Sequence, residues 1–496
     1  MAAISTMMIS ESSAILPWLP LILITVPLWM VLYNVWLHPL RRYPGPPLAV
    51  SSPLYYYYML YRGTLHSTIK DFHDKYGDVL RISPGRLVYR NAEAWKEICG
   101  HRKAGAAPFT KDEEFYAETP SGHNILTTPN EADHSRYRRQ LSHAFSDRAM
   151  KEQEPLLQSY VDLLIERLRQ YSSQEPVDMT RWYNFATFDI IGDLAFGEPF
   201  KCLQDSHYHP YVTTVFRSVK GTHLMRPFLV LPKALLKLAV PRSLQKAMEG
   251  NYRLTSEKVI RRLELETSRP DFITYILKHN DEKGLRLSEI KANASILIIA
   301  GSETTATLLS GCTFYLMKNP ACYKRLVEEI RGAFNQESEI NIHSIAKLQY
   351  LHAVLEESLR VYPPVPAILP RTVPKGGAFI NGRHVPEGTS VSMAYFSAFR
   401  AKSNFVDPDS FIPERWLENR DPRFEFDKRE ALQPFSYGPR NCLGKNLAYT
   451  EMRLIMTRIL WNFDLSLEPS CHDWANQLSF TVWEKKPLMI NLIPVQ

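Results

Sequence analysis

The sequence predicts a mainly α-helical protein with a minor β-sheet, preceded by an N-terminal transmembrane helix. Three observations carry this prediction. Residues 14–37 contain no charged side chain, residues 291–317 are apolar on almost every side of a helix, and residues 79–91 alternate in the manner of two short strands. The α+β chain of 496 residues then divides into an anchor, a proline-rich hinge and one large domain, at 1–40, 41–50 and 51–496.

The apolar stretch at 14–37 has the length and the flanking charges of a signal anchor. A bilayer-spanning helix needs about 20 apolar residues, and a signal peptide would have a shorter apolar core with a basic start. Glu11 is the only charge before the stretch, whereas Arg41 and Arg42 follow it directly. By the positive-inside rule, the rest of this single-pass protein then faces the cytosol.

The next ten residues, RRYPGPPLAV at 41–50, are rich in proline. Pro44, Pro46 and Pro47 surround Gly45, and they cannot continue a helix. We therefore expect a stiff, extended hinge between the anchor and the large domain.

The large domain is predicted to be helical in its middle, with strands toward both ends. Residues 79–91 (VLRISPGRLVYRN) predict two strands around a Pro-Gly turn. Residues 291–317 predict a buried central helix, and residues 376–395 predict further strands and turns. The Asn293 sequon lies inside the central helix, so we expect it to carry no glycan.

Composition excludes several classes of protein. The net charge of +7 suits a protein near anionic lipid and is too small to indicate a nucleic-acid partner. The six cysteines are scattered without CxxC pairs, which argues against a disulfide framework and against zinc, and which fits a reducing compartment.

One of these cysteines, Cys442, lies in the unusual stretch PFSYGPRNCLGKNLA at 434–448. A single thiolate without other ligands nearby is what haem iron takes as its axial protein ligand. Gly438 would then allow a tight turn, and Gly444 a close approach to the porphyrin where a helix begins. Arg440 could bind a propionate, and Phe435 could pack beside the sulfur and exclude water.

The spacing Phe-x-x-Gly-x-Arg-x-Cys-x-Gly matches the haem-binding signature of the cytochrome P450 family at every fixed position. Essentially the whole chain resembles this family. Stretches such as NVWLHPLRRYPGPPL and FDIIGDLAFGEPF are similar to membrane-bound fungal members near the trichothecene C-15 hydroxylases of secondary metabolism. The resemblance implies the cytochrome P450 fold, haem b (iron protoporphyrin IX) as cofactor and Cys442 as the metal ligand.

The family resemblance gives a meaning to AGSETT, residues 300–305, on the apolar central helix. It implies that Ala300 and Gly301 leave room for dioxygen. It further implies that Thr304 hydrogen-bonds the oxygen and that Glu303 feeds protons toward it, as an acid–alcohol pair. The alternative is a polar stretch whose hydroxyls bond back to their own helix.

A second expected feature is a buried ion network behind the haem. Glu357 and Arg360 lie one helical turn apart, and the resemblance implies that Arg415 completes the network. The same Glu-x-x-Arg spacing occurs at Glu166 and Glu328, so the spacing alone is weak evidence. Three buried charges are costly unless fully paired, which suggests a structural role.

The resemblance also implies propionate ligands and places for substrate. Arg138 and Arg371 stand at positions where the family binds propionates, and His134 stands where tryptophan is usual. For substrate contacts we expect three places: residues 365–369, the Ile298–Ile299 pair, and the loop around Ile125.

These features predict a monooxygenase that hydroxylates or epoxidises an apolar small molecule, such as a terpenoid or polyketide, with O2. The chain has no flavin or nicotinamide fingerprint, so an NADPH–cytochrome P450 reductase, with cytochrome b5 as a further donor, should supply electrons. We expect docking at the cationic face near Arg136, Arg139 and Lys445, contact with membrane lipid, no nucleic acid, and localisation in the endoplasmic reticulum membrane.

Two other functions stay open at this point. One is a haem-thiolate isomerase or dehydratase, a class that tends to lack the acid–alcohol pair. The other is a non-catalytic haem-binding protein. A requirement for NADPH, reductase and oxygen would distinguish the monooxygenase from both.

Overall fold

The computed structural model describes residues 18–495, apart from 103–104, 117–121, 173–174, 229–239, 266, 268 and 282–283. The described residues are mainly helical with small sheets, as the sequence predicts.

The elements have the following bounds. The helices are α2 (Leu19–Leu32), α3 (Pro47–Ser51), α4 (Leu54–Tyr61), α5 (Leu65–Tyr76), α6 (Glu93–Cys99), α7 (Glu131–Ser142), α8 (Asp147–Ser172), α9 (Met179–Phe196), α10 (Cys202–Asp205), α11 (Pro210–Met225), α13 (Arg242–Glu264), α14 (Phe272–His279), α15 (Leu287–Lys318), α16 (Pro320–Ala333), α17 (Ile342–Ile345), α18 (Gln349–Val361), α19 (Tyr395–Phe399) and α20 (Lys445–Asn462). The strands are β1 (Val79–Ser83), β2 (Arg86–Tyr89), β3 (Thr110–Lys111), β4 (Val177–Asp178), β5 (Arg371–Thr372), β6 (Ala378–Ile380), β7 (Arg383–Val385), β8 (Ser390–Met393), β9 (Phe463–Leu467), β10 (Ser479–Phe480), β11 (Val482–Trp483) and β12 (Met489–Pro494). Short turns include the π-helical η2 (Tyr33–Leu37) and the 3-10 turns η5 (Glu337–Glu339), η6 (Pro413–Trp416) and η9 (Gly438–Arg440).

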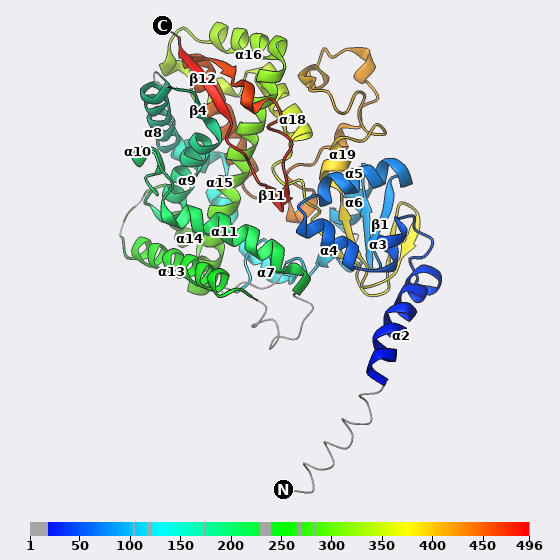
Figure 1. The fold of residues 1–496 in the computed structure, drawn as a ribbon. Helices are drawn as coiled ribbons and strands as arrows, with labels where there is room; N and C mark the ends of the chain where they lie inside the picture. Colours follow the sequence, from blue (N-terminus) through cyan, green and yellow to red (C-terminus); the bar gives the residue numbers. More distant parts are fainter. Residues whose placement is uncertain are drawn as a thin grey trace.

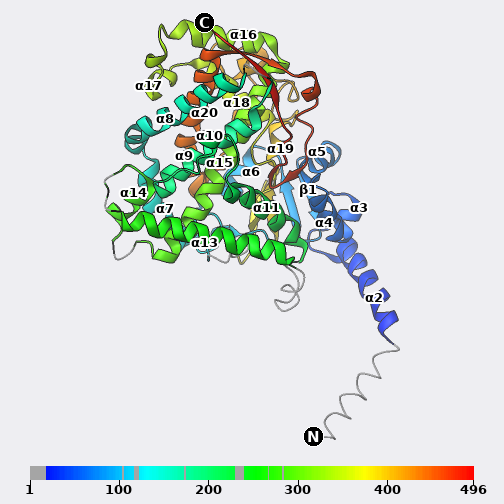
Figure 2. The same ribbon diagram turned by 60° about the vertical axis from the view of Figure 1, so that its left-hand side comes forward.

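These elements form a larger helical lobe and a smaller lobe with the main sheet. In Figure 1 the helices α8, α9, α13, α15 and α16 belong to the larger lobe, and β1 lies beside α3–α6 in the smaller one. The turned view in Figure 2 shows α2 leading away from the smaller lobe, while the C-terminus lies at the far end of the larger lobe near α16.

Helix α15 forms the centre of the larger lobe. It begins at Leu287 and runs unbroken to Lys318, and most of its side chains are buried, as the all-round apolar pattern predicts. Its main partner is α9, which is buried along almost its whole length. The two helices come close at Gly301, where an added Cβ would lie 2.6 Å from Ile191 Cδ1. Gly301 is therefore needed for helix packing as well as for any space it leaves beside the cavity.

The predicted strands are confirmed. Strands β1 and β2 form the antiparallel hairpin expected at 79–91, and β6, β7 and β8 fall within 376–395. The five-stranded sheet has the order β1-β2-β8-β5-β3, with β2 and β8 parallel. Its last pair joins Lys111 to Arg371, which brings two cations side by side.

The predicted hinge differs from the structure. Only residues 44–46 are extended, because α3 begins at Pro47, a position in the first turn of a helix where proline's missing N–H costs nothing. The segment is also packed rather than free. The Pro44 carbonyl accepts a hydrogen bond from Arg81 N at 2.7 Å, and a Cβ on Gly45 would lie 2.2 Å from Arg81 O.

The expected anchor falls partly outside the described residues, which exclude 14–17. The described part consists of α2 and η2, with Pro27 inside the helix. Ile24, Trp29 and Trp36 are each at least 60% exposed on it. Among the described residues, α15 is long and apolar enough to cross a bilayer but is mostly buried in the domain, and the apolar helical stretch Ile24–Leu37 is shorter.

Candidate active site

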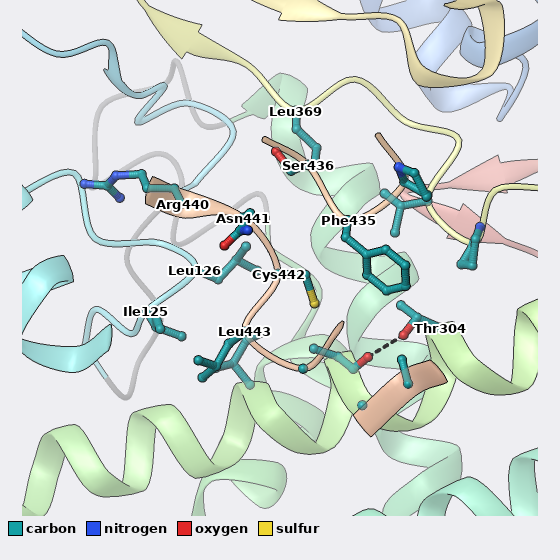
Figure 3. Close-up of a pocket in the computed structure, with 18 of the residues that line it drawn as sticks. Ile125, Leu126, Thr304, Leu369, Phe435, Ser436, Arg440, Asn441, Cys442 and Leu443 are labelled. Carbon is teal, nitrogen blue, oxygen red and sulfur yellow. Dashed lines mark hydrogen bonds between the residues drawn. The ribbon is translucent and has the colours of Figure 1, made fainter. Parts of the chain in front are cut away.

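A cavity of about 280 Å³ lies between α15 and the loop that carries Cys442. Figure 3 shows the Cys442 sulfur and the Phe435 ring at this space, with Thr304 beyond them on α15. The lining is mostly apolar and comes from α6, α7, α15, α18, α20, the Ile125 loop and the segment after α18. Its apolar members include Trp95, Ile125, Leu126, Phe145, Ile191, Ile296, Leu297, Leu308, Val365, Leu369, Met393, Tyr395, Phe435, Leu443 and Leu447.

The loop before α20 is fixed by its own backbone. Cys442 N donates to the Phe435 carbonyl at 2.8 Å, which closes the turn that contains η9. Gly438 has φ +76°, and a Cβ there would lie 2.0 Å from Cys99 O. No other residue type fits this position, because both the left-handed φ and the close approach to α6 require glycine. The turn directs the cysteine sulfur into the cavity.

Cys442 is exposed toward the cavity, while protein atoms surround it on its other sides. Burial raises the pKa of its thiol, and the Gly444 N–H and the Arg138 and Lys445 cations lower it. Gly444 immediately precedes the first residue of α20, so this N–H belongs to the N-terminus of that helix, as expected. All six cysteines are free in the structure.

The cavity contains a group of cations beside the Cys442 loop. Arg371 and Lys111 are at most 6% exposed, and among the described residues neither has a carboxylate partner. Burial first, then Arg371 and Arg440, lower the pKa of Lys111 well below its usual range. Its ammonium lies 4.0 Å from the centre of the Tyr116 ring. Buried, unpaired cations favour an anion in the cavity.

Lys111 was missed by the sequence analysis. The signal that could have found it is the pairing of 110–111 with 371–372, but a two-residue strand is too short to recognise from alternation. His134 lies in the same group and lines the cavity. Burial and then the neighbouring cations, Arg440 first, lower the pKa of His134 to about 3, so its imidazole is neutral and can donate one hydrogen bond.

Two of the three arginines expected at propionates differ in their contacts. Arg138 lines the cavity and donates to both the backbone carbonyl and the side-chain oxygen of Asn441, the latter at 2.7 Å. The guanidinium of Arg440 is turned toward the start of α7. It extends away from the Cys442 sulfur in Figure 3 and donates to Thr128 O at 2.8 Å and to Glu131 at 2.9 Å. Arg440 also lines the cavity, but its guanidinium is engaged at the start of α7, so its contact with a propionate stays a prediction.

Helix α15 presents one face to the cavity. Its lining residues follow helical spacing: Ile296, Leu297, Ala300, Gly301, Thr304, Thr305 and Leu308. Ile298 and Ile299 do not belong to this face, so the prediction that they contact substrate is wrong by one or two positions. The Thr304 hydroxyl donates to the Ala300 carbonyl at 2.6 Å, the dashed line in Figure 3, which is the back-bonding alternative.

Glu303 is placed differently from the expectation. It does not line the cavity. Its carboxylate accepts hydrogen bonds from Lys485, which is buried in the segment after β11, and from Thr307 at 3.4 Å. Burial lowers the pKa of Lys485, and the Glu303 carboxylate opposes that shift.

The Ile125 loop does reach the cavity, and a residue that the sequence singled out for another reason holds it there. Asn293 is buried, and its side-chain oxygen accepts a hydrogen bond from Ile125 N at 2.9 Å. Asn293 thus lies inside the buried central helix, as the sequence predicts.

The three charges expected behind the site form one buried network. Glu357 accepts hydrogen bonds from Arg360 at 2.8 and 2.9 Å and from Arg415 at 3.2 Å. Arg415 also pairs with Asp427 at 2.5 Å. Backbone carbonyls, including that of Phe399, take further donors of Arg360. Because every charge is paired, the network fixes the connection between α18 and η6.

Comparisons with known proteins identify the family. A model of cytochrome P450 matches residues 44–492. The chain belongs to the cytochrome P450 family. Three relatives carry the name cytochrome P450 monooxygenase: astJ and aclL of Aspergillus oryzae and atr2 of Stereocaulon alpinum. They are 52%, 47% and 46% identical to this chain, each over 94% of it and over 94%, 95% and 92% of their own lengths.

A cytochrome P450 carries haem, and this one is an oxygenase that requires O2, an organic substrate and a redox partner. The residues of the cavity fit such a cofactor. The Cys442 thiol reaches the cavity from the loop before α20, and Cys99 of α6 also lines it. The buried cations Lys111 and Arg371 have no carboxylate partner among the described residues. A thiolate-ligated dianionic porphyrin would satisfy both.

Proposed function

We propose that this cytochrome P450 is a haem-thiolate monooxygenase that hydroxylates or epoxidises an apolar terpenoid or polyketide of fungal secondary metabolism. The single observation that carries the proposal is the meeting of the Cys442 thiol, a group of buried cations and a threonine-bearing helix face around one cavity. When bound, the haem would activate oxygen in a reaction that consumes two electrons and two protons.

The residues of the chain would have the following roles. Cys442 would hold the iron, its sulfur directed by the Gly438 turn and shielded by Phe435. Lys111, Arg138 and Arg371 would hold the carboxylates, with His134 donating a hydrogen bond. Ala300, Gly301 and Thr304 would border the space for oxygen, and Gly444 would let the porphyrin approach the start of α20.

The wall that faces this space supports the proposed substrate class. Ile125, Leu126, Leu297, Val365 and Leu369 give it an apolar surface. Such a surface binds a hydrocarbon skeleton by area and offers few polar groups to orient it. The names of the similar proteins, all cytochrome P450 monooxygenases of fungi, support a role in oxidative tailoring of small molecules.

Electrons would come from a separate NADPH–cytochrome P450 reductase, with cytochrome b5 as a further donor, in the endoplasmic reticulum membrane. The exposed apolar side chains of α2 and η2 support a single-pass anchor. Of the cations expected at the docking face, Arg136 is already paired with Asp133 and Glu289 at 2.8 and 2.7 Å. Docking would therefore rely on other cations, such as Lys445.

The test begins with the protein expressed with haem. The reduced, carbon monoxide-bound form should show the absorption band of thiolate-ligated haem, and Cys442→Ser should lose it. Reconstitution with the reductase and NADPH, against extracts of fungal terpenoids and polyketides, should give oxygenated products that carry label from 18O2. Products formed without NADPH or oxygen would indicate an isomerase or dehydratase instead.

A further inference from the structure

The turn at residues 124–128 carries part of the apolar wall of the cavity. Ile125 and Leu126 line the cavity from this turn (Figure 3). Leu126 is 40% exposed, so the turn lies between the cavity and the surface of the protein. These residues belong to no helix or strand. The place of the two side chains therefore depends on how the turn is held.

The turn fixes its own shape through Asn124. The side-chain oxygen of Asn124 accepts hydrogen bonds from Leu126 N at 3.0 Å and from Thr127 N at 3.1 Å. Its backbone carbonyl accepts from Thr128 N at 3.0 Å, and its backbone N–H donates to the Thr127 hydroxyl at 3.1 Å. An asparagine that bonds its own following backbone in this way forms a compact turn. Residues 124–128 should consequently move as one unit.

The unit is fastened at two places. At its end, the Thr128 carbonyl accepts a hydrogen bond from Arg440 of the cysteine loop at 2.8 Å, and Asn130 then caps the start of α7. At its beginning, Ile125 N donates to the side-chain oxygen of Asn293 at 2.9 Å. Within the part of the chain that the structure describes, this is the hydrogen bond that joins the turn to α15.

The orientation of the Asn293 amide is set by its two partners. Asn293 is fully buried, and its side-chain nitrogen donates to the Glu289 carbonyl at 2.8 Å. A carbonyl can only accept and the Ile125 N–H can only donate, so the amide has one arrangement that satisfies both. A buried amide is costly unless it is hydrogen-bonded. Asn293 therefore holds the turn from a fixed position.

The hydroxyl residues further along α15 behave differently. Ser302, Thr304 and Ser310 each donate to the carbonyl four residues earlier, at 2.6, 2.6 and 2.8 Å. Their hydrogen bonds stay within the helix. Asn293 makes the same kind of bond with its nitrogen and uses its oxygen to bind a second segment.

We propose that Asn293 is a positioning residue for the substrate, an inference that rests on the proposed monooxygenase function. Asn293 does not line the cavity, so it acts through the turn and not by contact. It keeps Ile125 and Leu126 against α15 as a continuous apolar wall. Without this hydrogen bond the turn would move away from α15, and a bound molecule would cover less apolar area.

The chain offers a test variant and a matched control. In Asn293→Ser the hydroxyl can bond to the carbonyl four residues earlier, as Ser302 does, but it is too short to reach Ile125 N. Asn319, directly after the end of α15, donates to the Tyr315 carbonyl at 2.7 Å with the same four-residue spacing. Asn319 does not line the cavity, so Asn319→Ser removes the same kind of bond without touching the turn.

The first experiment measures the contact itself in the haem-loaded, full-length protein. Hydrogen exchange followed by mass spectrometry should show the peptide that contains Ile125 exchanging about fivefold faster or more in Asn293→Ser than in the wild type. In Asn319→Ser this peptide should exchange as in the wild type. Unchanged exchange in Asn293→Ser overturns the proposal.

The second experiment compares two nitrogen ligands of the haem iron, imidazole and 4-phenylimidazole, through the shift of the haem absorption band. Imidazole is too small to need the wall, whereas the phenyl ring of the larger probe must pack on it. Asn293→Ser should raise the Kd of 4-phenylimidazole by about fivefold or more and that of imidazole by less than about twofold. A general loss of stability would affect both probes alike, so the ratio of the two Kd values reports on the wall.

A double variant tests whether Asn293 acts through the turn. Ile125→Ala alone should also weaken the binding of 4-phenylimidazole, because it removes part of the wall. Combined with Asn293→Ser it should add little, since both changes remove the same contact. Fully additive losses would overturn the proposal.

The outcomes separate this inference from the proposed function. If the wild type forms oxygenated products but the ratio of Kd values is unchanged in Asn293→Ser, or changes equally in Asn319→Ser, the positioning role is wrong and the monooxygenase stands. If the wild type binds both probes but forms no oxygenated product with NADPH, reductase and oxygen, the proposed function fails and the role in substrate binding fails with it. If Asn293→Ser does not fold, Asn293→Gln, whose longer side chain displaces the turn, is compared in the same way, and an unchanged ratio overturns the proposal.

Discussion

Lys485 and Glu303 form a buried ion pair that joins the C-terminal segment to the central helix. Their side chains are 5% and 8% exposed, and Thr307 accepts a further hydrogen bond from Lys485 at 2.7 Å. The pair lies behind the cavity face of α15, so it fixes the segment between β11 and β12 against the helix that borders the cavity.

Breaking this pair should cost much more than breaking its exposed neighbour. Lys485→Met leaves the Glu303 carboxylate buried without its cation, and we expect the free energy of unfolding to fall by about 3–5 kcal/mol. Lys220→Met breaks the exposed pair with Glu484 and should cost no more than about 1 kcal/mol. Urea unfolding of the variants checks this, and Lys485→Met combined with Glu303→Gln should recover much of the loss. Equal losses in both single variants would contradict the assignment.

Two glycines of the cysteine loop should respond in opposite ways to alanine. Gly438→Ala places a Cβ 2.0 Å from Cys99 O at positive φ, so the loop must move and we expect loss of the thiolate-haem spectrum. Gly444→Ala meets nothing closer than 3.7 Å, at an ordinary φ of −87°. The haem-free protein should fold normally with this alanine. Near-wild-type far-ultraviolet circular dichroism and thermal unfolding would show this. Destabilised haem-free Gly444→Ala would be inconsistent with this geometry.

The network around Glu357 predicts a large effect on stability without a role in oxygen chemistry. Arg415→Met removes a partner of both Glu357 and Asp427, each fully buried, and should lower the free energy of unfolding by about 3–5 kcal/mol. Arg325→Met, which breaks a half-exposed pair with Glu414, serves as the control and should cost no more than about 1 kcal/mol. Denaturant titration measures both, and a similar cost for the two would argue against a buried network.

Lys111 should affect the haem-free and haem-loaded forms in opposite directions. Without an anion its buried ammonium is unpaired, so Lys111→Met should raise the thermal midpoint of the haem-free protein. With haem bound the same change removes a carboxylate partner, so haem should dissociate faster, as transfer to apomyoglobin would measure. Lys75→Met, at an exposed helix position, should change neither. A change of the same sign in both forms would exclude the proposed contact.

Glu451, a buried acid of α20 that lines the cavity, makes stability depend on pH in a defined direction. The folded protein keeps this proton to about pH 8, whereas the unfolded chain loses it near 4.5. Between these two pH values unfolding therefore releases a proton. The stabilising contribution of the raised Glu451 pKa is complete below pH 4.5 and is lost by about pH 8. Relative to wild type, Glu451→Gln should gain stability as pH rises, by up to about 5 kcal/mol at pH 9. Parallel curves of stability against pH for the two proteins would show that the pKa of Glu451 is not raised.

The general fold and the position of Cys442 at the cavity could be predicted because their signals are local. Apolar periodicity reports the burial of α15, and the glycines around Cys442 report a turn that only glycine permits. Lys111 and Glu451 could not be predicted in this way. Lys111 reaches the cavity through a two-residue strand pairing, and Glu451 reads as an ordinary polar position of a helix until α15 is packed against it.

The differences between the expected and the observed site have the same origin. The sequence places Arg440, Glu303 and Ile298 near the correct loop or helix turn, but the direction of each side chain depends on partners far away in the chain. Glu131 takes the guanidinium of Arg440, and Lys485 takes the carboxylate of Glu303. Ile298 does not line the cavity although Leu297 does, because a helix turns about 100° for each residue.

The contacts of residues 34–51 bear on where a soluble form of the protein should begin. The Asn34 carbonyl accepts a hydrogen bond from Arg81 at 2.9 Å, the Asn34 side chain donates to Ser51 O at 2.8 Å, and Leu40 is buried against the sheet lobe. Truncation at the prolines would remove Asn34 and Leu40 from the edge of the sheet lobe and expose apolar surface there. A cut ahead of Asn34 removes most of the apolar helix and retains every one of them.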